Sequence, residues 1–152
     1  MKLATRIVAV GHWDCTTAID RVTLDADERH CRRATLKGEQ GTVFLLDLPQ
    51  PTTLRDGDGL LLDDGSLVRV VGRAEQLIEI TAVSPNDLAR FAWHLGNRHV
   101  NVEVIGSKLR IRRDHVLELM LRRLGAEVTP VEAPFDPERG AYHRHGEISH
   151  GT

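Results

Sequence analysis

This sequence has few aromatic residues, and it lacks long apolar runs, cysteine clusters and a large surplus of charge of either sign. No apolar run approaches the roughly 18 residues of a membrane-spanning helix, and the N-terminus is typical of a first strand rather than a signal peptide. The two cysteines, Cys15 and Cys31, are too far apart for a CxxC metal motif, and they do not indicate a disulfide framework. These absences argue against a membrane protein and a disulfide-stabilised secreted domain, so we expect a cytoplasmic protein.

The charge balance argues against nucleic acid as the main partner. The chain has 20 basic and 22 acidic residues, a net charge of -2, whereas nucleic-acid binders usually carry a strong basic surplus. Common catalytic motifs are also missing, namely GxSxG, the P-loop and HExxH. The length of 152 residues suits one large domain or two small ones, and nothing in it predicts an enzyme.

The first half of the chain predicts an all-β domain over residues 1–73. Apolar and alternating segments follow one another at short intervals, and residues 25–28 form a polar turn between two of them. Short strands at this spacing favour a small β-sandwich or barrel. The expected strands are residues 3–10, 21–24, 29–36, 42–48, 60–62 and 67–71.

The second half changes its hydrophobic period and predicts a ferredoxin-like β-α-β-β-α-β domain over residues 74–134. Ser84 is placed to cap a first helix, and Gly96 to end it in the left-handed conformation. Asp114 and Gly125 are expected to bound a second helix. Its apolar stripe comprises Val116, Leu117, Met120, Leu121 and Leu124. The expected strands are residues 76–83, 100–105, 109–113 and 126–131.

Residues 135–152 predict a flexible tail, because prolines and glycines are frequent there and apolar residues are few. The overall fold class is therefore α+β, with a small β-sandwich or barrel-like domain, a ferredoxin-like domain and a histidine-containing tail.

The sequence is rich in histidine. It has eight histidines against six aromatic residues, and most of the histidines lie in the second half. Imidazole is a good ligand for nickel, copper and zinc. His94 and His99 bracket the predicted end of the first helix, although a helix-terminal and a solvated histidine would give the same spacing. Alternate histidines on the tail could chelate one ion, or simply be solvated. The six histidines after residue 90 are His94, His99, His115, His143, His145 and His150.

A basic cluster in the second domain leaves a different interpretation open. A βαββαβ domain with a basic face could bind RNA, but such modules stack bases on aromatics exposed on their sheet, and these strands carry none. A solvated face or a protein-docking surface, as in an adaptor without metal, is the simpler reading. The cluster comprises Lys108, Arg110, Arg112, Arg113, Arg122 and Arg123.

Three motifs in order give the sequence a family resemblance. They are HLGNRH at residues 94–99, DHVLELM with LGA at 114–126, and APFDPERGAY at 133–142. Together they resemble the urease accessory protein UreE family of nickel metallochaperones. The resemblance implies a homodimer in which His99 of both chains holds Ni²⁺ at the interface, and Zn²⁺ or Cu²⁺ would compete for the same imidazoles.

The resemblance also implies roles for the other histidines and for partner proteins. His143 and His145 of the tail would supplement the site, with His150 beyond them, whereas His94 and His115 would be weaker or peripheral ligands. As in that family, nickel would pass to the urease apoprotein and its accessory complex with help from an accessory GTPase. This sequence has no nucleotide motif, so GTP hydrolysis would belong to the partner. The short tail favours delivery over storage, and neither a membrane nor a nucleic acid is expected as a partner.

Overall fold

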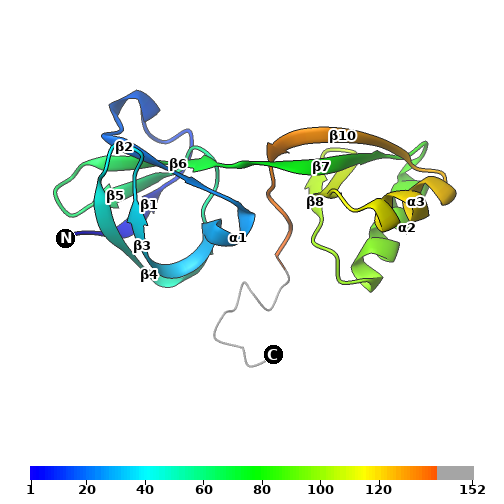
Figure 1. Cartoon of the computed structure of the whole chain (residues 1–152), viewed down its shortest axis with the longest axis horizontal. Coiled ribbons are helices and arrows are strands. Elements are labelled where there is room, and N and C mark those ends of the chain that lie inside the picture. Colours follow the sequence, from blue (N-terminus) through cyan, green and yellow to red (C-terminus); the bar gives the residue numbers. More distant parts are fainter. Residues whose placement is uncertain (140–152) are drawn as a thin grey trace. The chain divides into compact units, whose positions relative to one another are not determined.

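The computed structural model describes residues 1–139, and these form two compact units, Met1–Arg73 and Ala74–Arg139 (Figure 1). Each unit has a hydrophobic core of its own. Among the described residues, no helix has the length and apolar character needed to cross a membrane.

Unit 1, Met1–Arg73, is a single curled sheet of six strands. Strands β1 and β4 run parallel, as do β2 and β6, and the other neighbours are antiparallel. The sheet curls into a half-barrel around its core, as expected for the barrel-like β domain. In sheet order the strands are β2 (Asp20–Leu24), β6 (Leu67–Gly72), β5 (Gly59–Leu62), β1 (Lys2–Val8), β4 (Val43–Thr53) and β3 (His30–Lys37).

The turn after β3 is hydrogen-bonded to a buried carboxylate on β2. Asp20 is only 5% exposed, and it accepts hydrogen bonds from the backbone N–H groups of Gln40 at 2.9 Å and Thr42 at 3.1 Å. In the same turn, the N–H of Glu39 donates to the carbonyl of Arg21 at 2.9 Å. Burial raises the pKa of Asp20, but the hydrogen bonds outweigh burial and hold its pKa below the ordinary value.

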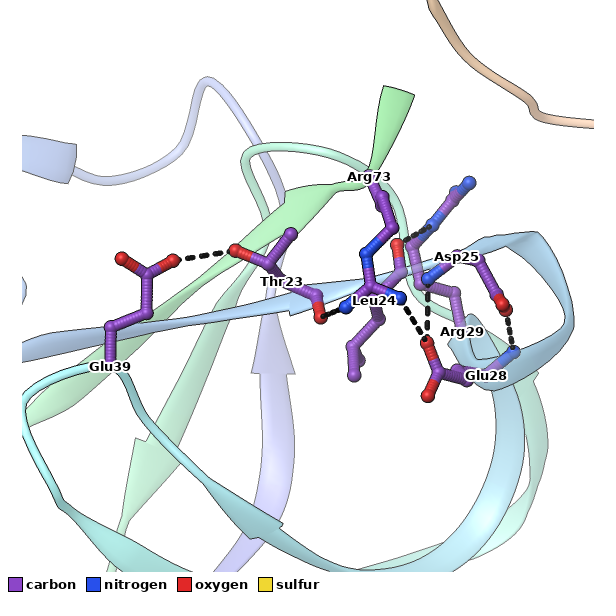
Figure 2. A network of polar contacts seen from close by, with 7 residues as sticks. All are labelled: Thr23, Leu24, Asp25, Glu28, Arg29, Glu39 and Arg73. Atoms are coloured by element: carbon purple, nitrogen blue, oxygen red, sulfur yellow. Dashed lines mark hydrogen bonds and ion pairs between the residues drawn. The ribbon is translucent and has the colours of Figure 1, made fainter. Parts of the chain in front are cut away.

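The segment between β2 and β3 forms a one-turn helix, α1 (Ala26–Arg29), where we predicted a polar turn. Asp25 accepts from the N–H of Glu28 at 2.8 Å, and Glu28 accepts from the N–H of Asp25 at 2.9 Å (Figure 2). This capping box satisfies two N–H groups at the helix start. Arg29 is fully buried, and its Nε donates to the carbonyl of Leu24 at 3.2 Å.

Arg73, the last residue of unit 1, is held on that unit by both backbone and side chain. Its N–H donates to the carbonyl of Leu24 at 2.8 Å, and its Nη2 donates to the carbonyl of Thr23 at 3.2 Å. Its Nη1 also lies 3.7 Å from the Glu28 carboxylate (Figure 2). The polar contacts of unit 1 therefore extend to Arg73.

Unit 2, Ala74–Arg139, follows the β-α-β-β-α-β order. Its four strands form an antiparallel sheet in the order β10-β7-β9-β8, and α2 and α3 cover one face (Figure 1). This is the topology of the predicted ferredoxin-like domain, so the fold prediction is confirmed. The elements are β7 (Ala74–Thr81), α2 (Pro85–Asn97), β8 (Glu103–Ile105), β9 (Lys108–Arg112), α3 (His115–Arg123) and β10 (Glu127–Pro134).

The helix starts in unit 2 agree with the sequence analysis. Ser84 accepts from the N–H of Asp87 at 3.1 Å, with Pro85 in the first turn of α2. Asp114 accepts from the N–H of Leu117 at 3.0 Å and so caps α3. Both caps satisfy N–H groups that the first turn of a helix leaves without partners.

Three local predictions for unit 2 are wrong. Gly96 lies within α2 and does not end it. The strand expected over residues 100–105 is confined to β8, Glu103–Ile105. Val116 is 73% exposed and therefore does not belong to the buried stripe of α3.

The C-terminal boundary of unit 2 also differs from the sequence prediction, which started a flexible tail at residue 135. Phe135 and Pro137 are buried, so the packed part of the unit continues to Arg139. The three tail histidines, His143, His145 and His150, lie outside the described residues.

Candidate metal centre

His99 occupies a special backbone position directly after α2. Its N–H donates to the carbonyl of Gly96 at 3.0 Å, and the N–H of Val100 donates to the carbonyl of Leu95 at 3.1 Å. This pair of bonds defines a Schellman motif, and His99 holds the left-handed position with a φ of 58°. Leu95 and Val100 join the same core cluster, which supplies the hydrophobic contact typical of this motif. His99 is thereby fixed in its backbone while its residue surface is exposed.

A histidine at this position is unusual, because the left-handed region favours glycine. A residue with a Cβ pays roughly 1–2 kcal/mol to adopt it. Among the described residues, His99 is the one non-glycine residue with a positive φ. Backbone strain of this kind clusters at functional sites, where a particular side chain is needed.

His94 lies in the last turn of α2 and is half-buried. Its imidazole meets the indole of Trp93 edge-on, with ring centroids 5.1 Å apart and planes at 87°. Its backbone carbonyl accepts from Nη1 of Arg98 at 3.3 Å. The position near the negative end of the helix dipole suits a histidine without any metal.

The other histidines of the described chain stand apart from this turn. His115 is the exposed first residue of α3. In unit 1, His30 Nδ1 is 2.8 Å from Thr53 Oγ1, and His12 is exposed on a loop. Within residues 1–139 of a single chain, no three histidine, cysteine or acidic side chains gather as a metal site. A metal site built on His99 would therefore need ligands from beyond residues 1–139 of one chain.

An apolar groove of about 390 Å³ runs along the outer side of α3 and includes Arg98, the neighbour of His99. Its exposed apolar side chains are those of Val116 and Leu119, which are 73% and 43% exposed. This surface was not predicted, because the hydrophobic period of α3 indicates a single apolar stripe that includes Val116. The spacing of residues 116, 119 and 123 on a second helical face was the available signal. The groove is lined by Arg98, Val116, Leu119, Met120, Arg123 and Leu124.

The basic cluster that left an RNA-binding interpretation open is largely paired within unit 2. Arg110 lies 3.0 Å from the carboxylate of Glu79, and Lys108 lies 3.3 Å from it. Burial raises the pKa of Glu79, but the bonds from Arg110 and Lys108 outweigh burial and lower the pKa. Arg112 is likewise bonded to Glu75 at 2.8 Å. These ion pairs neutralise much of the surface that RNA would need.

Comparison with known proteins gives the family of both domains. A family model described as UreE urease accessory protein, N-terminal domain, matches residues 4–73, and the C-terminal domain model matches residues 75–152. Urease accessory protein UreE of Bradyrhizobium sp. (strain ORS 278) is 52% identical over 150 residues, covering 96% of this chain and 71% of that protein. The protein of the same name from Beijerinckia indica is 47% identical over 150 residues, covering 99% of this chain and 86% of that protein. The chain thus belongs to the UreE family of urease accessory proteins, which are chaperones of urease maturation and not enzymes.

Proposed function

We propose that this protein is a metallochaperone that delivers Ni²⁺ during urease maturation, with one ion held between two copies by His99 of each. The observation that carries the proposal is the exposed imidazole at the strained left-handed position after α2. The Schellman motif fixes the backbone there, so the ligand is preorganised.

A homodimer supplies what one chain lacks. A two-fold axis presents the same patch twice, so a single histidine per chain becomes a pair of ligands. The groove beside Arg98 leaves Val116 and Leu119 exposed, and apolar side chains of this kind are suited to cover one another in a symmetric interface. We therefore place the dimer contact along α3.

Further ligands complete the proposed site. His143 and His145 of the tail add to the His99 pair, with His150 as a reserve, and His94 and His115 serve as weaker or peripheral ligands. Imidazoles must be neutral to bind a metal, so nickel affinity should fall in acid. Zn²⁺ and Cu²⁺ compete at such a site, because imidazole suits all three ions.

The proposed setting is the cytoplasm, and the proposed partners are the urease apoprotein with its accessory complex and an accessory GTPase. The GTPase would supply nucleotide hydrolysis, since the P-loop motif is missing from this sequence. Unit 1 would dock these partners, while unit 2 would bind the metal and dimerise.

His99→Gly tests the central ligand without penalising the fold. Glycine adopts the left-handed position freely, so this variant should unfold with a free energy higher by up to about 1 kcal/mol. The same substitution removes the imidazole, and we expect nickel affinity to fall by at least about 100-fold in calorimetry. A matched His115→Ala variant should keep its affinity within a few fold.

Tight nickel binding by His99→Gly at the wild-type affinity would contradict the proposal. A loss of binding together with a loss of stability would contradict the assignment of strain at residue 99. Thermal and urea unfolding on the same samples separates these results.

A further inference from the structure

The outer face of the sheet in unit 1, away from its core, carries apolar and basic side chains together. Core residues alternate with them along the strands, as Leu60 does with Leu61 on β5. Leu61 pairs in register with Leu67 of β6, and both residues are half-buried. The group, which we call the basic-apolar face, comprises Arg6, Trp13, Ile19, Leu61, Leu67 and Arg69.

One row of this face is mainly aliphatic and crosses four strands. Ile19 lies beside Leu67, because its N–H donates to the carbonyl of Leu67 at 2.9 Å, and Ile19 is 46% exposed. At the other end of the row, Arg6 of β1 pairs in register with Leu61 and is exposed. The row therefore offers three aliphatic side chains and ends in a cation.

Trp13 covers part of the neighbouring row. A Cβ added to Gly59 would lie 2.8 Å from Cε2 of Trp13, so the indole packs directly on the Gly59 backbone. Its Nε1 donates to the carbonyl of Gly57 at 3.1 Å, which holds the ring in place. Arg69 pairs in register with Gly59, so the indole lies beside Arg69.

Arg69 is a half-buried cation without a counter-charge in the described part of the chain. Its Nε is buried and has no hydrogen-bond partner there, and neither Arg69 nor Arg6 forms an ion pair among residues 1–139. Arg21, the other cross-strand neighbour of Arg69, is instead paired with Glu39 at 3.0 Å. A partly desolvated guanidinium without a counter-ion is costly, and a carboxylate that binds it lowers this cost.

We propose that the basic-apolar face docks a protein partner whose carboxylates lie between aliphatic side chains. The carboxylates pair with Arg6 and Arg69, and the aliphatic side chains cover Ile19, Leu61 and Leu67. This inference rests on the proposed docking role of unit 1 and gives that role its surface and its chemistry.

Charge and ring exposure distinguish this partner from two others. A second copy of the same face would bring Arg6 and Arg69 against their own counterparts, and like charges repel. Single-stranded nucleic acid binds by stacking its bases on exposed rings, whereas Trp13 is half-buried on Gly59 and its neighbours are aliphatic. An acidic and aliphatic protein segment suits both the cations and the apolar row.

The first test is an NMR titration of the full chain with a blocked pentapeptide of alternating leucine and glutamate. Amide shifts should concentrate at residues 6–8, 59–61 and 67–69. The same peptide with glutamine in place of glutamate should bind at least about tenfold more weakly, because it lacks the carboxylates. Equal binding of the two peptides, no shifts at these residues, or tighter binding of a single-stranded oligouridine there would overturn the proposal.

Variants of the two cations locate the contact. Arg69→Gln should weaken binding of the glutamate peptide by about tenfold, and Arg6→Gln should act in the same direction. Because Arg6 is exposed, its variant covers the case in which Arg69→Gln fails to fold. The matched control is Arg33→Gln, since Arg33 is exposed and lies 4.0 Å from Asp47, outside this face.

The control should bind the peptide within about twofold of the wild type, because distant exposed charges are screened by salt. Wild-type affinity in both Arg69→Gln and Arg6→Gln, or an equal loss in Arg33→Gln, would overturn the proposal.

Nickel calorimetry on the same variants separates this surface from the proposed metal site. Arg69→Gln and Arg6→Gln change unit 1 only, so both should keep the nickel affinity of the wild type. Nickel binding without peptide binding in the wild type would overturn the basic-apolar face alone. Peptide binding without nickel binding would support the face and overturn the proposed nickel function.

Discussion

The two units of this protein use their polar and apolar groups differently. In unit 1, Asp20 fastens a turn, Arg29 bonds backbone carbonyls and His30 meets a threonine hydroxyl. In unit 2, His99 stands exposed in a strained turn, and Val116 and Leu119 leave an apolar groove open. Groups that are satisfied inside a domain stabilise it, whereas exposed and strained groups are available to partners. We therefore propose that these polar contacts of unit 1 stabilise its fold, whereas His99 and the groove of unit 2 bind partners.

The largest expected effect follows from adding a charge to the groove. If the proposed dimer forms along α3, Val116→Asp should shift it toward monomers by at least about 100-fold, because dimerisation would bury an unpaired carboxylate. The monomer should keep its fold, since Val116 is 73% exposed. Val83→Asp is the matched control, because Val83 is 92% exposed and lies outside the groove. Sedimentation equilibrium gives the two masses, and a dimeric Val116→Asp would refute the α3 interface.

A carboxylate of unit 1 should show the opposite behaviour. Asp20→Ala leaves the N–H groups of Gln40 and Thr42 without their acceptor, which should lower the free energy of unfolding by about 1–3 kcal/mol. Nickel affinity should not change, because unit 2 holds the proposed site. Urea unfolding measures the stability and calorimetry the nickel affinity of one preparation. A weakened nickel site would contradict the proposal that unit 2 alone binds the metal.

The effect of Asp20 should depend on pH in a defined direction. The pKa of Asp20 in the folded protein lies below the ordinary value for aspartate. Its contribution is therefore complete above the ordinary pKa and is lost as the pH falls through the lower folded value. The stability difference between the wild type and Asp20→Ala should shrink in acid, and a difference that grows in acid would contradict this electrostatic role.

The smallest of these effects concerns the start of α3. Asp114→Ala removes the cap on the N–H of Leu117, which should cost about 1 kcal/mol in unfolding free energy. Dimer mass should be unaffected, since the cap is not part of the groove.

Leu119→Ala should have the opposite effect, because it should weaken the dimer with little loss of stability. Thermal unfolding and sedimentation of both variants would show whether stability and association separate on one helix.

Local signals in the sequence were sufficient for the fold of unit 2. Ser84 and Asp114 mark helix starts through their side-chain oxygens, and Gly125 marks the end of α3 with a φ of 98°. The change from period 2 to period 3.6 then gives the element order. Asp25 and Glu28 also have the spacing of the capping box that starts α1, but the polar composition of residues 25–28 predicts a turn.

The end of α2 required tertiary information. Gly96 is the obvious left-handed residue by propensity, yet the position falls on His99. Leu95 and Val100 both pack in the core, and this sets where the Schellman motif closes. The burial of Phe135 and the groove along α3 were missed for similar reasons. Periodicity does not say whether Val116 is covered, and composition does not say that Phe135 is buried.

We propose above all that two copies of the chain share one nickel ion through His99. A calorimetric nickel titration, with light scattering on the same samples, tests it for the wild type and for the chain truncated after Tyr142. We expect a dimer that binds about one tight ion per two chains, with affinity reduced but not lost by truncation. One tight ion on each monomer, or no tight binding in either chain, would contradict it.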